Sequence, residues 1–274
     1  MPTVKLSART PPPVAGPTGR LRHPWLYALP GGKLPAVVVC GGRRYHHVST
    51  YKHDFFAATG LYQCGDELAV LKLGRTTPFL GLPMDWAGRL LEGRELKLLE
   101  CVRDVPGVPR VIGRVGRNGL LREFVPGHPL GRREHVSDEF FDELRALLSR
   151  LHLRDVAYVD LNKRQNILVG DDGRPRLIDF QIALCLPATG WRRVAPVRWL
   201  LARFQRADDY HYLKHKRRLR PDLLTPAEHA QLERISIWIR LHRCMARPLT
   251  HLRRRTLSRL QKTESVEVPG SDAK

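Results

Sequence analysis

The stretch "YVDLNKRQNILVGDDGRPRLIDF" at 158–180 constrains the fold more than any other part of the chain. It contains two short apolar, strand-like segments joined by the turn signal "GDDGRP". Asp160, Asn166 and Asp179 lie at the ends of these segments. Asp and Asn are common in turns because their side chains bond nearby backbone groups. The same three side chains also carry the oxygen ligands that Mg²⁺ prefers, so the surrounding sequence must decide between a turn role and a metal role.

The sequence upstream predicts a small antiparallel sheet and one helix. Residues 46–73 are β-prone and contain the turn signal Cys64-Gly65-Asp66. Leucines recur on a helical period in "GLPMDWAGRLLEGRELKLLECVRDV". Short strands follow in "VPGVPRVIGRVGRNGLLREFVPG", with Asn118-Gly119 as the expected hairpin turn. The run "AVVVC" at 36–40 is expected to be an isolated strand.

The sequence downstream is mainly helical. "SDEFFDELRALLSRLHLRD" predicts a helix with Ser137 as its N-cap and acidic residues in its first turn. From 195 onward the pattern is largely helical, with a proline-marked break at 221–226. Residues 1–43 are expected to form a flexible arm, because their first 35 residues are rich in Pro and Gly.

Taken in order, these motifs resemble the protein-kinase-like superfamily over roughly residues 44–225. The resemblance implies a two-lobed α+β fold, with a small antiparallel-sheet lobe at 44–125 and a mainly helical large lobe at 126–225. A basic helical extension with a disordered tail is expected at 226–274. The implied activity is transfer of the ATP γ-phosphate with Mg²⁺, a reaction in which the protein mainly positions groups and neutralises charge.

The resemblance gives roles to residues of the small lobe. Lys72 in "AVLKL" would reach the α- and β-phosphates of ATP, and Glu95 in "EGRELKLLECV" would hold Lys72 in place. Glu92 lies one helical turn earlier and is the alternative partner for Lys72. An edge lysine and surface glutamates are the ordinary alternative for these residues.

The nucleotide-binding part of the small lobe departs from the family pattern. "LLREFVPGHPL" resembles the hinge between lobes, where the backbone of Glu123, Phe124 and Val125 would bind adenine. The glycine-rich loop that covers the phosphates is absent, since the equivalent "TYKHDFFAATGLYQ" contains only Gly60. Gly60 is therefore the candidate glycine for close approach to the nucleotide, and backbone N–H groups or Lys52 are the alternatives for covering the phosphates.

In the large lobe, Asp160 would orient the acceptor hydroxyl, and Asn166 and Asp179 would hold Mg²⁺. Five residues separate Asp160 from Asn166, where the family usually has four. This spacing leaves Asn162 as an alternative ligand, although "NILV" after Asn166 fits the family better.

Three further departures indicate an atypical member. Val159 replaces the Arg that precedes the catalytic Asp, and Gln181 replaces the Gly of the metal-binding turn. The Ala-Pro-Glu motif is missing, so the activation segment is very short. The resemblance is therefore to bacterial kinases of lipopolysaccharide core sugars and to RIO kinases. The expected acceptor is a protein Ser or Thr hydroxyl, and the alternatives are a glycolipid sugar hydroxyl or a non-catalytic nucleotide-binding pseudokinase.

The chain is strongly basic, with a formal net charge of +20 and a pI of about 10.5. Residues 191–262 hold 19 Lys and Arg against 5 acidic residues. Leu249, Leu252, Leu257 and Leu260 can share one face of a helix, so this part is expected either to lie on an anionic membrane surface or to form a solvated basic face. Nucleic-acid binding is the weaker alternative, because few aromatic residues lie among the basic ones.

The cysteines and the absence of a long apolar run bear on the cellular location. Cys40, Cys64, Cys101, Cys185 and Cys244 are scattered without metal-binding spacing. They are expected to be reduced thiols in a reducing compartment. No run of 18 apolar residues occurs, and the expected location is the cytoplasm, with peripheral association to an inner membrane as an addition.

Overall fold

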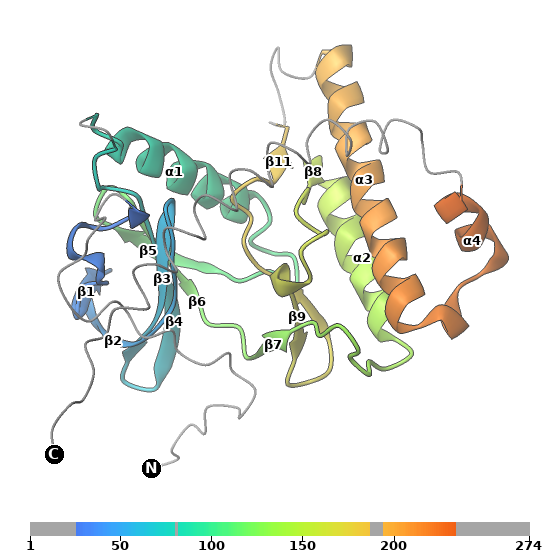
Figure 1. Ribbon diagram of the computed structural model, residues 1–274, viewed down its shortest axis with the longest axis horizontal. Coiled ribbons are helices and arrows are strands. Elements are labelled where there is room, and N and C mark those ends of the chain that lie inside the picture. The colour runs from blue at the N-terminus through green and yellow to red at the C-terminus, as the bar shows by residue number, and fades with distance from the viewer. Residues whose placement is uncertain (1–25, 80–81, 187–193, 234–274) are drawn as a thin grey trace, which may run out of the picture.

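The computed structural model describes residues 26–79, 82–186 and 194–233. Figure 1 shows a sheet-rich lobe built from the N-terminal half and a mainly helical lobe built from the C-terminal half. This arrangement confirms the α+β class with an antiparallel-sheet lobe and a helical lobe. The boundaries at 125 and 225 stay predictions.

The small lobe contains a six-stranded sheet in the order β1-β2-β3-β4-β6-β5, and every neighbouring pair is antiparallel. Side chains of β1 alternate between exposed and buried, as expected for a sheet with one covered face. The strands are β1 (Val37–Cys40), β2 (Arg43–His53), β3 (Ala57–Cys64), β4 (Glu67–Gly74), β5 (Val111–Val115) and β6 (Gly119–Glu123).

The segment at 26–43, which the composition assigned to a flexible arm, packs against this sheet. Leu26 is completely buried, and Leu29 and Leu34 form a small apolar cluster with Ala58 of β3. β1 is not isolated, because it pairs with β2 along its whole length. The prediction of an arm was wrong here, since burial of the leucines outweighs the loop-forming tendency of the prolines and glycines around them. Residues 1–25 lie outside the described residues.

Helix α1 (Asp85–Cys101) approaches β4 closely at two glycines. A Cβ atom on Gly88 would lie 2.5 Å from the Arg75 carbonyl oxygen, and one on Gly74 would lie 2.9 Å from the Gly88 Cα. Any larger residue at either position would push the helix away from the strand. This contact sets α1 beside the strand that carries Lys72.

The β5–β6 hairpin turns at 116–118 instead of at the expected Asn118-Gly119 pair. Gly116 adopts the positive φ of +59° that the turn requires. Asn118 is nearly buried, and its Nδ2 donates to the carbonyl oxygens of Arg75 (3.3 Å) and Asp85 (3.2 Å). The Asn-Gly prediction was wrong because this Asn ties the hairpin to the start of α1.

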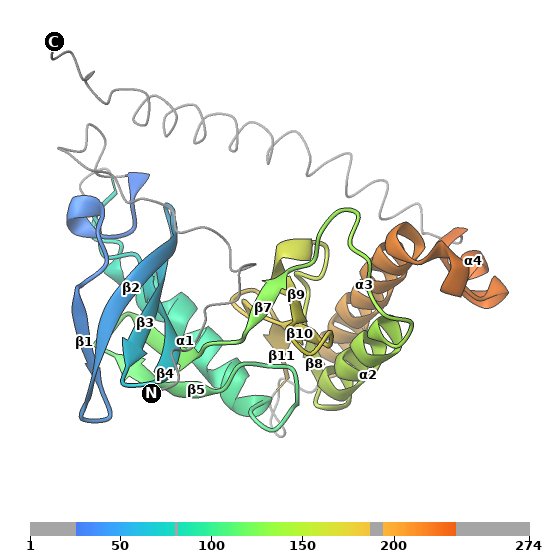
Figure 2. The ribbon, with the colours of Figure 1, turned by 90° about the horizontal axis from the view of Figure 1, so that it is seen from below.

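In its described residues, the large lobe combines the helices α2, α3 and α4 with two small sheets, and Figure 2 shows α2 and α3 beside the strands of this lobe. One sheet has the order β10-β9-β7 and the other pairs β11 with β8, all antiparallel. The elements are β7 (Gly127–Pro129), α2 (Phe140–Leu153), β8 (Val156–Ala157), η3 (Arg164–Asn166), β9 (Ile167–Gly170), β10 (Pro175–Leu177), β11 (Leu184–Cys185), α3 (Ala195–Leu219), η5 (Pro221–Leu223) and α4 (Pro226–Glu233), with η2 (Pro30–Gly32) in the small lobe.

Helix α2 begins two residues later than a Ser137 N-cap would place it, with Glu139 at the N-cap position. Ser137 contributes only its carbonyl oxygen, which accepts from the Phe140 N–H at 3.3 Å, so it is not the N-cap. Its neighbour Asp138 instead pairs with Arg220 at 2.7 Å, just after the end of α3. Phe140 and Phe141 are fully buried and pack edge to face. The helix start is thus fixed by the core and by a long-range ion pair.

Only the beginning of the basic extension belongs to the described residues. Helix α4 packs on the large lobe through Leu232, which is 2% exposed, and through the pair between Lys216 and Glu228 at 2.9 Å. The four leucines expected to share a membrane-facing helix at 249–260, and the expected disordered tail, lie outside the described residues. No helix in the described ranges is long and apolar enough to cross a membrane.

Candidate functional site

Lys72 on β4 joins residues from three distant parts of the chain. Its Nζ donates to Glu95 Oε2 at 2.7 Å and to Asp179 Oδ1 at 2.8 Å. Glu95 comes from α1, and Asp179 comes from the turn after β10. The Lys72 side chain is 7% exposed, the Glu95 side chain is fully buried, and Asp179 remains one-third exposed. The predicted Lys72–Glu95 pair is present, and Asp179 is the member of this cluster that contacts solvent.

Lys72 and Asp179 favour their ionised forms, although Lys72 is buried. Burial alone would lower the pKa of Lys72, but the negative charges of Glu95 and Asp179 outweigh burial and raise the pKa above its ordinary value. For Asp179, burial acts to raise the pKa, and the nearby Lys72 reverses the effect and lowers the pKa to about 2. The site therefore presents an ammonium group beside a carboxylate that is ionised at neutral pH.

Arg122 is a member of the cluster that the sequence motifs did not reveal. Its Nη1 lies 3.5 Å from Glu95 Oε1, and the side chain is 8% exposed. In the β4–β6 register, Lys72 lies opposite Leu120 and Val70 lies opposite Arg122, so Arg122 and Lys72 share one face of the sheet. The sequence does contain one indication of this role, which is the position of an Arg inside the apolar run "LLREF".

The structure distinguishes the two candidate glutamates of α1. Glu95 pairs with Lys72, whereas neither carboxylate oxygen of Glu92 has a hydrogen-bond partner within the described residues. Glu92 is only 2% exposed. Burial, reinforced by the nearby negative charge of Glu95, raises the pKa of Glu92 to about 8, although Lys72 opposes the shift. Glu92 is thus a buried carboxyl that is largely protonated at neutral pH.

Asp160 lies in the loop after β8 and is 8% exposed. Its Oδ2 accepts from Lys163 Nζ at 2.6 Å and from Asn166 Nδ2 at 2.9 Å. Asn162, the alternative ligand, turns away, because its Oδ1 accepts from Lys214 Nζ of α3 at 3.1 Å. The structure therefore brings Asp160 and Asn166 together.

Asp208 of α3 holds the backbone of this loop and was not found from the sequence. Its two carboxylate oxygens accept from the N–H groups of Tyr158 and Val159, each at 2.8 Å. Asp208 is completely buried, and His152 Nε2 lies 3.3 Å from it. Val159 has a φ of +68°, which is strained for a β-branched residue. The buried carboxylate thus stabilises an unfavourable backbone conformation directly before Asp160.

Tyr158 and Ile178 connect the Asp160 loop to the Asp179 turn. The Tyr158 hydroxyl donates to the Ile178 carbonyl oxygen, and the Ile178 N–H donates to the Asn166 carbonyl oxygen at 3.0 Å. The Tyr158 ring packs edge to face against Phe180, with 5.0 Å between ring centroids. These contacts place Asn166 and Asp179 on adjoining segments.

The expected hinge at 123–125 joins β6 to β7 between the lobes. The Glu123 N–H donates to the Arg110 carbonyl oxygen at 2.8 Å, and the Phe124 N–H donates to the Leu68 carbonyl oxygen at 3.3 Å. Within the described residues, no hydrogen bond uses the Val125 N–H. Val125 is therefore the hinge residue whose backbone N–H can bind a ligand.

Gly60 is not brought to the cluster. It pairs with Leu71, whereas its neighbour Thr59 pairs with Lys72, so Gly60 faces the opposite side of the sheet. A Cβ atom at Gly60 would lie 2.5 Å from Leu34 Cδ1 and 3.0 Å from the Ser49 carbonyl oxygen. Packing beneath the segment that contains Leu34 accounts for this glycine.

The donor set fits a hard divalent cation of the Mg²⁺ type. Asp179 offers an ionised carboxylate, and Asn166 offers an amide oxygen on the adjoining segment. Mg²⁺ usually takes one or two carboxylates from the protein and completes its shell with waters and phosphate oxygens. In the described ranges, no group of three His, Cys, Asp or Glu residues forms a metal cage by itself.

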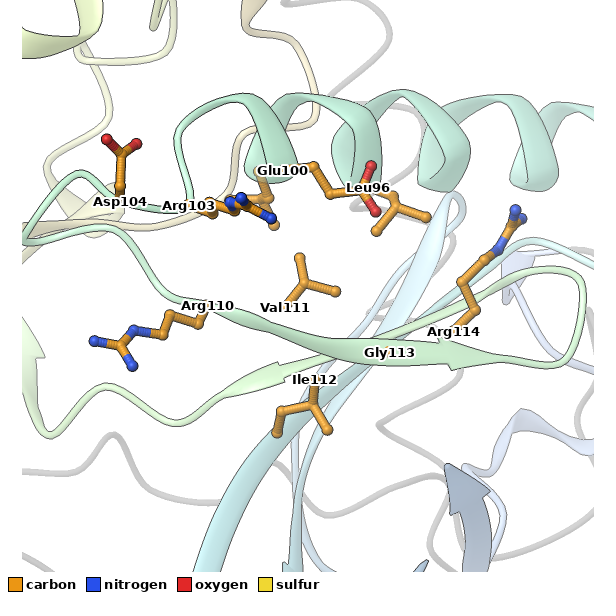
Figure 3. A pocket seen from close by; sticks show the side chains of 10 residues that line it. Leu96, Glu100, Arg103, Asp104, Arg110, Val111, Ile112, Gly113 and Arg114 are labelled. Carbon is orange, nitrogen blue, oxygen red and sulfur yellow. The ribbon is translucent and has the colours of Figure 1, made fainter. Parts of the chain in front are cut away.

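Two cavities lie near this cluster without containing Lys72 or Asp179. One of about 680 Å³ lies between α1 and β5 (Figure 3), with Leu96, Val111 and Ile112 beside Arg103 and Arg110. The other, of about 420 Å³, is lined by the hinge residues 123–125 and by Arg174 and Arg176. The lining of the first cavity comes from α1, β5 and the segment between them, and the lining of the second combines the hinge with residues beside and in β10.

Comparisons with known proteins identify no sequence family. No family model matches the chain, and no curated protein matches it.

Solved structures give distant similarities. A Rio2 kinase from Chaetomium thermophilum, crystallised as an ADP/Mg²⁺-phosphoaspartate complex, is similar at 16% identity with a TM-score of 0.46, over 72% of this chain and 61% of that one. Another structure of Rio2 kinase from the same organism is similar at 17% identity with a TM-score of 0.44, over 65% and 59%. The chain thus spans about three fifths of the length of these kinases, and its chemistry has to be inferred from its own site geometry.

Proposed function

We propose that the chain is an ATP- and Mg²⁺-dependent phosphotransferase that transfers the γ-phosphate to a hydroxyl group. The observation that carries this proposal is the Lys72 ammonium group, which bridges Glu95 and Asp179 at 2.7 and 2.8 Å. A buried ammonium beside an ionised, partly exposed carboxylate suits a triphosphate with its metal ion. Catalysis of phosphoryl transfer consists mostly of positioning and charge neutralisation, which such a cluster supplies.

The residues around this cluster would share the work of holding the nucleotide. Lys72 would bind the α- and β-phosphates, and Glu95 would keep its ammonium group in place. Asn166 and Asp179 would hold Mg²⁺, which when bound neutralises the charge on the β- and γ-phosphate oxygens. The Val125 N–H would bind adenine, and the backbone of the two preceding residues, Glu123 and Phe124, would form the rest of the adenine-binding edge.

Asp160 would orient the acceptor hydroxyl. Its Oδ2 is occupied by Lys163 and Asn166, which fixes the carboxylate and leaves Oδ1 for the hydroxyl. Lys163 lies 2.6 Å from Asp160, so a positive charge adjoins the position of the transferred phosphoryl group.

The acceptor that we propose first is a protein Ser or Thr hydroxyl. A sugar hydroxyl of a glycolipid is the second candidate, because β11 ends at Cys185 and α3 begins at Ala195. So short a connection offers little surface for a substrate peptide. A pseudokinase, which binds nucleotide without transfer, is the third possibility.

Radiolabelled γ-phosphate ATP separates these candidates when it is incubated with the purified protein, Mg²⁺, a protein acceptor and an extracted glycolipid. Label on protein supports the first acceptor, and label on glycolipid supports the second. Asp160→Ala is expected to abolish transfer while ATP binding, measured by calorimetry, stays within about threefold. Asp171→Ala, in an exposed turn, is the matched control. Full transfer by Asp160→Ala would contradict the role of Asp160, and ATP binding without transfer by the wild type would identify a pseudokinase.

A further inference from the structure

Two cysteines that the proposed reaction does not use lie in contact across the lobes. Cys101 is the last residue of α1, and Cys185 is the last residue of β11. Their Sγ atoms are 3.3 Å apart, although the residues are separated by 84 positions in the sequence. Cys101 is exposed and Cys185 is half-buried. A disulfide has an S–S length of about 2.05 Å, so a shift of roughly 1 Å is enough to form the bond.

We propose that Cys101 and Cys185 form an oxidation site, at which a peroxide converts the two thiols into a disulfide that ties α1 to the strand after the Asp179 turn. The other described cysteines, Cys40 and Cys64, lie in β1 and β3 of the small-lobe sheet. The sequence expectation of scattered, reduced thiols stays a prediction. It did not anticipate that folding would bring this pair together.

The chemistry needs one peroxide molecule for each pair. The Cys101 thiolate attacks one peroxide oxygen, the O–O bond breaks, and Cys101 becomes a sulfenic acid while hydroxide leaves. The Cys185 sulfur then attacks the Cys101 sulfur, the S–O bond breaks, and a second hydroxide leaves. Each cysteine loses one electron and one proton, and the two hydroxides leave as water after taking up these protons.

The environment assigns different roles to the two sulfurs. Burial, together with its hydrogen bond to Cys101, raises the pKa of the Cys185 thiol to about 12. Cys185 is therefore the less reactive thiol, and the exposed Cys101 meets the peroxide first. In a reducing compartment, glutathione or a dithiol would return the pair to thiols, which makes the modification transient.

The location of the bond suggests its effect, and this part rests on the proposed function. Glu95 precedes Cys101 on the same helix, and β11 pairs with β8, which leads directly into the Asp160 loop. The cysteines are in contact while Lys72 holds both Glu95 and Asp179. The disulfide would therefore fix the lobes in the arrangement with these pairs formed, and would slow nucleotide exchange.

The first experiment detects the bond without any assay of activity. The native protein is treated with hydrogen peroxide, remaining thiols are alkylated, and tryptic peptides are analysed by mass spectrometry before and after reduction. A linked Cys101–Cys185 peptide is expected in the wild type and in the control Cys64→Ser. Its mass should be two hydrogens below the sum of the two thiol peptides. It should be lost in Cys101→Ser and in Cys185→Ser. Complete conversion of Cys101 to sulfenic acid, detected with a sulfenic-acid probe, without a bond to Cys185 would overturn the proposal. A disulfide between Cys101 and another cysteine would overturn it as well.

The second experiment measures dissociation of a fluorescent ADP analogue from the oxidised and the reduced protein. Oxidation is expected to slow dissociation at least about threefold in the wild type and in Cys64→Ser, and to leave Cys101→Ser unchanged. An unchanged rate with the linked peptide present would overturn the locking effect. A protein that forms the linked peptide and binds no nucleotide would instead refute the proposed function and leave the oxidation site standing.

Discussion

Lys72 and its partners come from a strand, a helix and a distant turn, whereas Asp160 and its partners lie within one loop. The Lys72 group is held by ion pairs between buried side chains, with Glu95 shared between Lys72 and Arg122. The Asp160 loop is held mainly through its backbone, by the carboxylate of Asp208. The Lys72 half of the site is thus held together by ion pairs between side chains. The Asp160 half is a loop whose backbone is hydrogen-bonded to a buried carboxylate.

This difference predicts different sensitivities. A buried ion-pair cluster responds strongly to removal of a single charge, because the remaining charges lose their partners. A loop anchored through backbone hydrogen bonds responds to loss of the anchor more than to changes in its own side chains. Four substitutions, from the largest expected effect to the smallest, test the contrast.

Lys72→Met is expected to have the largest effect. It leaves the Glu95 and Asp179 carboxylates without their ammonium partner, which should cost about 3 kcal/mol of unfolding free energy. Transfer activity should fall by about 10²–10³-fold, as for loss of an electrostatic stabiliser. Urea denaturation and radiolabel transfer measure the two effects. The double variant Lys72→Met/Glu95→Gln should regain part of the stability and none of the activity, and an equally unstable double variant would argue against a charge cluster.

Asp208→Asn tests the anchored loop. It replaces the carboxylate that accepts from the N–H groups of Tyr158 and Val159 by a neutral amide, and should lower the free energy of unfolding by about 2 kcal/mol. Amide exchange at these two positions, followed by NMR or mass spectrometry, should speed up while exchange in β4 is unchanged. The neighbouring Asp209→Asn is the control. Equal effects of the two variants would show that Asp208 is not a specific anchor.

Glu92→Gln tests the unpaired carboxyl of the Lys72 group by its pH dependence. The pKa of Glu92 is about 8 in the folded protein, whereas the ordinary pKa of a glutamate is 4.5. Between pH 4.5 and pH 8 the folded wild type therefore holds a proton that the unfolded chain has lost. Wild-type stability contributed by this group therefore falls as pH rises from 4.5 to 8. The free energy of unfolding of the variant should match that of the wild type near pH 5. At pH 8 it should exceed the wild-type value by on the order of 2 kcal/mol. A pH-independent difference would refute the buried protonated state.

Val159→Gly is expected to have the smallest effect and the opposite sign. Gly tolerates the φ of +68° that strains Val, so unfolding free energy should rise by roughly 0.5–1 kcal/mol. Thermal unfolding measures the change. In the Asp208→Asn background the gain should persist, because Gly relieves the strain whether or not the anchor is present. A loss of stability would mean that the Val159 side chain contributes packing that exceeds the strain.

Much of the Lys72 group could be predicted from sequence order alone. A Lys in an apolar strand, a Glu in the next helix and an Asp-Phe turn are local patterns, and their succession indicated one site. The choice between Glu92 and Glu95 could not be made, because both face the sheet from adjoining turns of one helix. Rotation of α1, set by the close approach of Gly88 to β4, decides which carboxylate reaches Lys72.

The residues that sequence reasoning missed act across long separations. Arg122 joins Glu95 through strand register, and Asp208 reaches Tyr158 from another helix. Their sequence neighbourhoods resemble an ordinary strand and an ordinary surface helix. Gly60 is an error in the other direction. The sequence predicted that it approaches the phosphates, but in the structure it packs against Leu34.

The sequence by itself determined the α+β class and the order of the elements, because hydrophobic period is a local property. It also named the side chains that we propose to bind a phosphate and a divalent cation, because residue chemistry is local too. Tertiary structure alone decided which glutamate pairs with Lys72, which carboxylate holds the Asp160 loop, and that Cys101 meets Cys185. These contacts depend on how helices pack against strands, and packing is settled by side-chain volumes and backbone approach between residues far apart in the chain.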